Sequence, residues 1–358
     1  MTGPLTGPLT APQTTPQTAP LAAPPTALVT GANGLLGSAL AARLALSWPG
    51  EVRCLVRSSS VLARLEPTLL AHPDKVRLVM GSLATVEACA PLAVGVDVVF
   101  HLAAALRGAP PDLVRDSVVA TRNLLEAIAL CAAPPRVVLA SSLAVYGTSR
   151  LARGGVIDEG SPIEACPERR DAYCFAKVRQ ERLAWEYRRR KGVRLCVARP
   201  GVVYASGVSP LVGRVGLGVP GMFVVLGGRA AVPLTHVDNC AEALALLGAR
   251  DGVEGRAFNV VDDELPETRE LVQQFEREVG PLRHIALPYW ATLGAAHLIA
   301  RYAESSHGQL PAFLTPYRVA ATYRGFRYDN ARMKGLGWRP RVATKDGLRE
   351  ALASLRHR

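Results

Sequence analysis

Tyr173 and Lys177 are the two residues whose types and spacing most directly suggest chemistry. Side chains four positions apart on a helix project from the same face, and a helix is expected over residues 171–191. A lysine ammonium beside a phenol stabilises the phenolate and lowers a pKa that is ordinarily about 10. Such a phenol can pass a proton near neutral pH. The spacing predicts a proton-transferring pair, and the alternative is an ordinary exposed pair on a helix.

A serine upstream can serve the same chemistry. Residues 136–147, with the sequence RVVLASSLAVYG, are typical of a buried strand that runs into a loop, and Ser142 lies in that loop. Taken alone, such a serine is more typical of a turn or a cap than of a catalyst. Its role therefore depends on what the rest of the chain implies.

Residues 26–37, with the sequence TALVTGANGLLG, predict a phosphate-binding turn between a strand and a helix. An apolar run at 27–29 breaks into three glycines before a helical pattern begins. Gly31 permits a sharp turn, Gly34 lets a pyrophosphate approach the backbone amides at the helix N-terminus, and Gly37 lets the helix pack close to the strand. The interpretation is a dinucleotide site, and the alternative is a plain glycine turn.

Strands and helices alternate along the body of the chain. Short apolar runs typical of strands follow the glycine turn, with helix-like sequence between them, at residues 52–57, 75–82 and 96–104. Residues 112–132 read as one long amphipathic helix. This alternation predicts an α/β fold with a doubly wound parallel sheet.

The three motifs together carry a family resemblance. TGxxGxxG at residues 30–37, SSxAVYG at 141–147 and Tyr-x-x-x-Lys at 173–177 occur in the order of the extended short-chain dehydrogenase/reductase superfamily. The chain resembles its NAD-dependent epimerase/dehydratase branch, and within that the 3β-hydroxysteroid dehydrogenase and dihydroflavonol reductase-like group. Segments 198–205, 234–239 and 328–340 also resemble that branch, so the resemblance covers residues 26 to about 355.

The resemblance implies a domain plan and a set of site residues. A Rossmann-type domain is expected over residues 26–200 plus 232–262, and a smaller substrate-capping domain over 201–231 plus 263–358. Ser142, Tyr173 and Lys177 are the implied catalytic residues, and no metal is expected. The implied cofactor-binding residues are Gly31, Asn33, Gly34, Leu35, Leu36, Gly37, Arg57, Leu102, Ala103, Ala104, Tyr173, Lys177, Pro200 and Val203. His101 is expected to be structural or to flank the cofactor.

The end of the second strand predicts the choice of cofactor. NAD-binding relatives place an acid there to accept from the adenosine ribose, whereas this chain has Val56 followed by Arg57 and three serines. A guanidinium binds a 2′-phosphate bidentately. We therefore expect NADP, with NAD as the alternative if an acid from another loop reaches the ribose.

Three functions are open. The first is an oxidoreductase that moves a hydride between a nicotinamide and a ketone or secondary alcohol, with a hydrophobic substrate walled by the apolar residues 222–226 and 289–300. The second is a nucleotide-sugar epimerase, which the acids Asp158 and Glu159 and the segment 234–239 also suit. The third is a non-catalytic dinucleotide-sensing protein. Leu143 and Ala144 stand where a sugar dehydratase needs an acid and a base.

Composition restricts the remaining possibilities. The net charge of +12 comes from a chain-wide arginine bias, since 37 of its 42 basic residues are Arg, so we expect no nucleic-acid partner. The seven scattered cysteines predict reduced thiols and a cytoplasmic protein. No apolar stretch reaches the roughly 18 residues of a transmembrane helix. Residues 1–25 are uncharged and rich in Pro and Thr, typical of a disordered tail. The resemblance implies a homodimer through helices 112–132 and 171–191.

Overall fold

The computed structural model describes residues 25–306 and 314–356. The predicted tail, apart from Pro25, lies outside the described residues.

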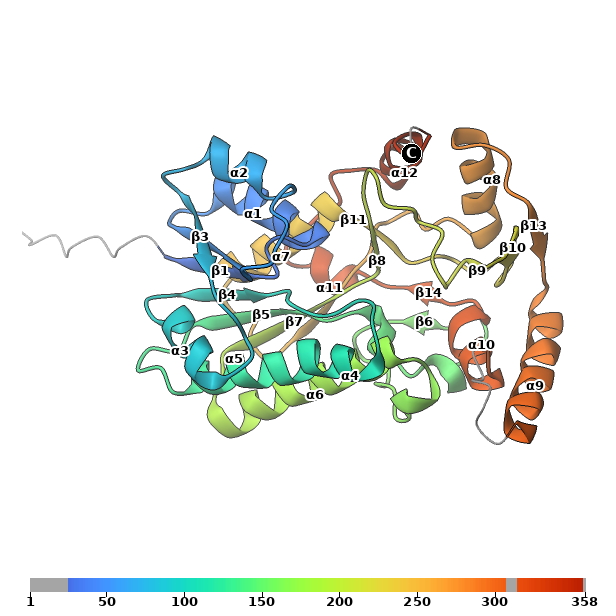
Figure 1. The fold of residues 1–358 in the computed structure, drawn as a ribbon, viewed down its shortest axis with the longest axis horizontal. Helices are drawn as coiled ribbons and strands as arrows, with labels where there is room; N and C mark the ends of the chain where they lie inside the picture. Colours follow the sequence, from blue (N-terminus) through green and yellow to red (C-terminus); the bar gives the residue numbers. More distant parts are fainter. Residues whose placement is uncertain (1–24, 307–313, 357–358) are drawn as a thin grey trace, which may run out of the picture.

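A seven-stranded parallel sheet forms the centre of the molecule (Figure 1). Its strand order is β12-β7-β5-β4-β1-β2-β3, so the chain winds outward in both directions from the boundary between β1 and β4. The doubly wound α/β prediction is confirmed. The strands are β1 (Ala27–Thr30), β2 (Val52–Val56), β3 (Val76–Met80), β4 (Val98–His101), β5 (Arg136–Ala140), β7 (Leu195–Pro200) and β12 (Ala257–Val260).

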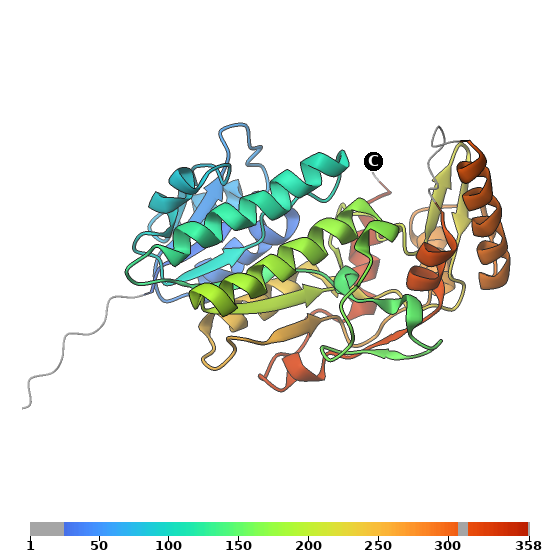
Figure 2. The same cartoon turned by 90° about the horizontal axis from the view of Figure 1, so that it is seen from below.

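Helices cover both faces of this sheet. Side chains alternate along each strand, so Ala27 and Val29 of β1 belong to the core on one face and Leu28 belongs to the core on the other. The first face carries α1 (Leu35–Ser47), α2 (Glu66–Ala71) and α7 (Val237–Ala249). The second carries α3 (Val86–Ala93), α5 (Ala120–Ala129) and α6 (Ala172–Lys191), and Figure 2 shows α5 and α6 side by side across it.

The helix expected over 112–132 is not regular. It begins as α4 (Pro110–Leu113), widens into a π-helical segment at Val114–Val119, and continues as α5. Within the wide segment the Ser117 carbonyl accepts from the Thr121 hydroxyl at 2.6 Å and from the Gln180 amide at 3.5 Å. Side-chain donors that enter the backbone ladder in this way disrupt regular α-helical pairing, which periodicity does not signal.

The smaller elements gather at one end of the sheet (Figure 1). A three-stranded sheet of β9 (Gly216–Val219), β10 (Met222–Val225) and β13 (His284–Ala286) lies near α8 (Thr268–Glu278), α9 (Tyr289–Ser305) and α10 (Pro316–Tyr323). Two further strand pairs join β8 (Val202–Tyr204) to β11 (Leu234–His236) and β6 (Val156–Ile157) to β14 (Arg327–Tyr328). The last helices are α11 (Ala331–Lys334) and α12 (Thr344–Ala353).

Part of the stretch assigned to the capping domain also serves the main core. Met333 and Trp338 are buried among the side chains of α1, α7 and the central sheet. The two-domain division remains a proposal. Among the helices of the described ranges, none is both long and apolar enough to cross a bilayer.

Candidate active site

One cavity of about 1270 Å³ brings the sequence-predicted site residues together. It is lined by residues that follow the carboxyl ends of β1, β2, β4, β5 and β7, where open α/β sheets bind ligands. All predicted catalytic and cofactor-binding residues line it: Gly31, Asn33, Gly34, Leu35, Leu36, Gly37, Arg57, Leu102, Ala103, Ala104, Ser142, Tyr173, Lys177, Pro200 and Val203.

Each of the three glycines of the first turn is suited to its position for a different structural reason. Gly31 has φ +69°, a left-handed conformation that favours glycine. A Cβ on Gly37 would lie 2.1 Å from the Gly31 carbonyl oxygen, so this position requires glycine for packing. A Cβ on Gly34, the N-cap of α1, would meet only that same oxygen, at 3.2 Å. The first turn of α1 holds no acid. The Gly34 amide donates to the Gly31 carbonyl at 3.0 Å, so the amides that follow it in the first turn of α1 are the ones that fit the pyrophosphate of a dinucleotide.

Ser142 and Tyr173 meet through their side chains. Ser142 caps the short 3₁₀ helix Leu143–Val145, where its Oγ accepts from the Ala144 amide at 3.1 Å. Tyr173 lies in the first turn of α6, which Asp171 caps by accepting from the Cys174 amide at 2.8 Å. A hydrogen bond joins the two hydroxyls and lowers the pKa of Tyr173, but burial outweighs it and raises that pKa overall. The expected lowering by Lys177 is wrong for this structure, because the ammonium is engaged elsewhere.

Lys177 is buried behind Tyr173. Its Nζ donates to the Ala140 carbonyl at the end of β5 and to Gln180 Oε1, both at 2.9 Å. Burial lowers the pKa of Lys177 to about 8, against the opposing charge of Glu181. An ammonium has three N–H donors, so these two bonds leave one that can reach into the cavity.

A buried chain of hydrogen bonds continues from Lys177 toward the cofactor loop. Gln180 Nε2 donates to Thr121 Oγ1 at 2.8 Å, and Thr121 donates its own proton to Ser117. His101 Nε2 must therefore carry the proton in its 2.8 Å contact with Thr121, and Nδ1 accepts from Thr30.

The far end of this chain reaches the main chain of the loop after β4. Thr30 Oγ1 accepts from the amides of Leu102 and Ala103, at 3.1 and 3.2 Å. Burial, followed by the charge of Lys177, lowers the pKa of His101 to about 3. His101 is thus a neutral structural residue. The sequence reasoning missed Gln180, whose only signal was its position three residues after Lys177.

A second buried network fixes the Ser142 loop against α6. Arg199 of β7 pairs with Glu181 at 2.5 Å, and Ser141 Oγ donates to the same carboxylate at 2.5 Å. Arg199 also donates to the Tyr146 hydroxyl at 2.8 Å, and Tyr146 donates to Asn259 of β12 at 2.6 Å. Ser141 directly precedes Ser142, and Glu181 follows Lys177 by one helical turn. This network therefore sets the distance between Ser142 and Lys177.

The family model described as "NAD dependent epimerase/dehydratase family" matches residues 27–260. The chain belongs to this family. Cinnamoyl-CoA reductase 1 of Arabidopsis thaliana is 30% identical over 195 residues, which are 52% of this chain and 55% of that protein. The chain thus spans about half the length of this curated relative. The 3 beta-hydroxysteroid dehydrogenase/Delta 5-->4-isomerase of Mycobacterium tuberculosis is 27% identical over 347 residues, 91% of this chain and 89% of that protein.

Solved structures agree on the fold. The structure titled gox2253 has a TM-score of 0.74 at 24% identity and covers 93% of this chain and 98% of its own. UDP-glucuronic acid 4-epimerase from Bacillus cereus, in complex with NAD, has a TM-score of 0.68 at 18% identity over 92% of this chain and 96% of its own. These likenesses concern the fold alone.

The cavity near the end of β2 is more charged than the sequence indicated. Arg57 is 73% exposed and lies 3.9 Å from Asp116 Oδ2 of the π segment. Arg107 and Arg115 also line the cavity, and sequence reasoning missed both; Arg115 pairs with Asp112 and Asp116. Asp116 is the kind of acid from another loop that could reach a ribose, so the choice between NAD and NADP depends on how these charges balance.

The expected apolar walls of the substrate end are wrong. No residue of 222–226 or 289–300 lines the cavity. Leu217 of β9 and Tyr323 of α10 line it instead, and behind them they pack in the same apolar cluster as Leu226 and Ala296 of α9, which do not line the cavity. Hydrophobicity predicted that these segments are apolar, but not which neighbouring element stands between them and the cavity.

The segments that suited an epimerase also lie outside the cavity. Asp158 accepts from the Ser161 hydroxyl at 2.9 Å within its own turn, and Glu159 accepts from the Asn259 amide at 2.8 Å. His236 and Asn239 are buried, and each hydrogen-bonds to Asp262. These residues hold the structure together, as expected for the two acids, which were not assigned to catalysis.

Proposed function

We propose that this protein is an NAD(P)-dependent oxidoreductase that interconverts a ketone, or another carbonyl compound, and its alcohol. The observation that carries the proposal is the convergence of Ser142, Tyr173 and Lys177 in the same cavity as a glycine cradle that fits a pyrophosphate. The family, which is NAD-dependent, and the reductase and dehydrogenase relatives support it.

Each side chain has a distinct task. Gly34 and its neighbours would hold the pyrophosphate, and the free donor of Lys177 would hold the nicotinamide ribose. When bound, the nicotinamide supplies or accepts the hydride. Tyr173 passes a proton to or from the substrate oxygen, and Ser142 hydrogen-bonds that same oxygen. Because burial raises the pKa of Tyr173, its phenol is protonated at neutral pH, which is the form that donates to a carbonyl during reduction.

We propose NADP as the preferred cofactor. Arg57, at the end of β2, lines the cavity and its side chain is 73% exposed, whereas Arg115 is already paired with Asp112 and Asp116. The Arg57 guanidinium would bind a 2′-phosphate, whose charge a free hydroxyl does not offer.

A nucleotide-sugar epimerase is the alternative. It would use the same three side chains, and this chain shares its fold with UDP-glucuronic acid 4-epimerase. Denaturing the purified protein and identifying released nucleotide separates the two functions. Tightly retained NAD would favour the epimerase. An exchangeable site, together with cofactor-dependent reduction of carbonyl compounds, would support the oxidoreductase, and failure to bind either dinucleotide would contradict both.

We also propose a cytoplasmic homodimer. All seven cysteines are free thiols, which supports a reducing compartment. Helices α5 and α6 lie side by side on one face of the sheet, where a second copy could add its own pair (Figure 2). Light scattering of the purified protein tests the dimer, and a monomeric mass at micromolar concentration would contradict it.

A further inference from the structure

The substrate end of the cavity carries positive charge that the proposed chemistry does not use. We call residues 208–217 and 314–323 the cap wall. The cap-wall residues that line the cavity include two charged ones, Arg214 and Arg318. No acid of the cap wall is among the described lining residues. The remaining side chains here are mainly apolar, including Val208, Val212 and Leu217. This end therefore combines apolar surface with two guanidinium groups.

Tyr323 links the two parts of the cap wall that carry these arginines. Its hydroxyl donates to the Gly213 carbonyl, which joins α10 to the loop that carries Arg214. The charges of Arg214 and Arg318 both act to lower the pKa of Tyr323, against its burial. The charge of Arg214 also acts on the Cys174 thiol, the neighbour of Tyr173 in sequence. Both arginines therefore lie near Tyr323, and Arg214 also lies near Cys174, the residue after Tyr173.

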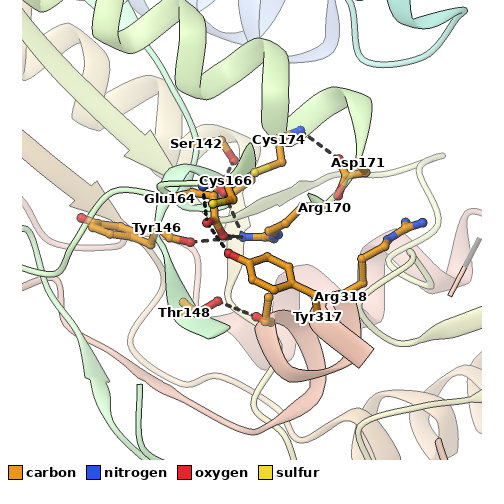
Figure 3. A network of polar contacts seen from close by, with 12 residues as sticks. Ser142, Tyr146, Thr148, Glu164, Cys166, Arg170, Asp171, Cys174, Tyr317 and Arg318 are labelled. Atoms are coloured by element: carbon orange, nitrogen blue, oxygen red, sulfur yellow. Dashed lines mark hydrogen bonds and ion pairs between the residues drawn. The ribbon is translucent and has the colours of Figure 1, made fainter. Parts of the chain in front are cut away.

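Hydrogen bonds fix α10 so that Arg318 faces the cavity. The Tyr317 hydroxyl donates to Glu164 Oε1 at 2.5 Å, and the Thr148 hydroxyl donates to the Ala321 carbonyl at 2.6 Å. Figure 3 shows Tyr317 pointing into this network and Arg318 pointing away from it. Arg318 is thus presented by an anchored helix.

Arg170 and Asp171, which also line the cavity, are held by the protein itself. Arg170 lies 4.0 Å from Glu164 and donates to the carbonyls of Ala144 and Tyr146. Asp171, the acid that lines this end, is used as the cap of α6. Arg214 donates to the Tyr328 hydroxyl at 3.1 Å, and within the described ranges no carboxylate forms an ion pair with it. A guanidinium in such a setting gains most from a bound carboxylate or phosphate.

We propose that Arg214 and Arg318 form an anion subsite, so that the substrate is a carbonyl compound with an apolar body and a carboxylate or phosphate group. This inference rests on the proposed function and adds a charge requirement to it. The apolar residues of the cap wall contact the body, the two arginines bind the anion, and Ser142 and Tyr173 meet the carbonyl oxygen.

Binding of simple probes tests the subsite without turnover. Benzoate, phenyl phosphate and the neutral benzamide are titrated by calorimetry into protein saturated with NADP, which keeps phosphate probes out of the dinucleotide site. We expect at least one anion to bind about tenfold tighter than benzamide. Arg214→Gln/Arg318→Gln should remove that preference. Arg283→Gln/Arg301→Gln, which removes the same charge at exposed positions outside the cavity, should retain it.

Turnover of matched aldehydes separates this inference from the proposed function. The wild type should reduce para-formylbenzoate with a kcat/KM about tenfold above that for para-tolualdehyde. Equal values would overturn the anion subsite and leave the oxidoreductase intact. Reduction of neither aldehyde would count against the oxidoreductase, and the binding preference would still decide the subsite.

Two binding outcomes would overturn the subsite. One is equal affinity of the wild type for all three probes, and the other is an anion preference that survives in the double variant. If the double variant does not fold, Arg214→Gln and Arg318→Gln alone decide, each with an expected loss of at least about threefold in anion affinity.

Discussion

The glycine turn after β1 and helix α10 both line the cavity, but they present different groups to it. The turn offers main-chain amides, and its shape follows from φ at Gly31 and the missing Cβ at Gly37. Helix α10 offers side chains, and its position depends on bonds to residues far away in the sequence, such as Thr148 to Ala321. The cofactor end is thus locally encoded, whereas the substrate end is assembled by tertiary contacts.

The largest effect on turnover is expected at Tyr173, between the cofactor end and the substrate end of the cavity. Tyr173→Phe removes the proton-passing hydroxyl and leaves the glycine cradle unchanged, so kcat should fall at least about 100-fold while dinucleotide affinity stays within about twofold. Tyr187→Phe, at a half-buried tyrosine of the same helix that bonds to Glu126 and does not line the cavity, is the matched control. Steady-state kinetics and fluorescence titration measure both quantities. Retention of more than about a tenth of the activity would show that another group passes the proton.

Two substitutions in the turn should separate packing from ligand binding. Gly37→Ala places a methyl 2.1 Å from a carbonyl oxygen and should lower the free energy of unfolding by about 2 kcal/mol or more. Gly34→Ala makes a single tight contact, 3.2 Å from the Gly31 carbonyl oxygen, and obstructs the pyrophosphate, so stability should change by less than about 1 kcal/mol and dinucleotide affinity should fall about tenfold. Urea unfolding and cofactor titration distinguish them, and identical behaviour of the two variants would refute the assignment.

The adenosine end should show a smaller effect on selectivity. The wild type is expected to bind NADPH at least about tenfold tighter than NADH, a difference of about 1.4 kcal/mol. Arg57→Ala should remove most of this preference, because it deletes a guanidinium that lines the cavity. Arg64→Ala, an exposed arginine outside the cavity, should not. Equal affinity of the wild type for the two cofactors would rule out the NADP preference.

The smallest effect is expected from the buried chain behind Lys177. Below a pH of about 8 the Lys177 ammonium is charged, and above it the charge is lost, so kcat/KM for reduction should fall as pH rises through that value. Gln180 Oε1 accepts from the ammonium and so favours the charged form. Gln180→Leu should lower the pKa and move this decline to lower pH, whereas the exposed Arg179→Leu should not. A profile that Gln180→Leu leaves unchanged would exclude the positioning role.

The same contrast explains which parts of the site could be read from the sequence. Gly31, Gly34 and Gly37 lie within one turn, and Tyr173 and Lys177 lie within one helical turn, so short spacings were enough to group them. Arg214 and Arg318 are about a hundred residues apart in the sequence, yet they line one cavity, and the Tyr323–Gly213 hydrogen bond joins the elements that carry them. No periodicity reports such a contact.

The errors have a related cause. Segment 222–226 was correctly expected to be apolar, but β9 and α10, rather than β10, face the cavity. The Tyr173 pKa was judged from its spacing to Lys177, whereas the partners of Lys177 are Ala140, from the sheet, and Gln180. The sheet itself was predictable because each strand is a short apolar run bounded by turn residues.

Transfer of a labelled hydride tests the proposed chemistry most directly. NADPH deuterated at its transferable position is incubated with the protein and para-formylbenzoate or para-tolualdehyde, and the product is examined by mass spectrometry. One deuterium should appear on the carbinol carbon with wild type, and almost none with Tyr173→Phe, although that variant still binds the cofactor. Unlabelled alcohol, or no consumption of either aldehyde by protein that binds NADPH, would contradict the assignment of Ser142, Tyr173 and Lys177 to carbonyl reduction.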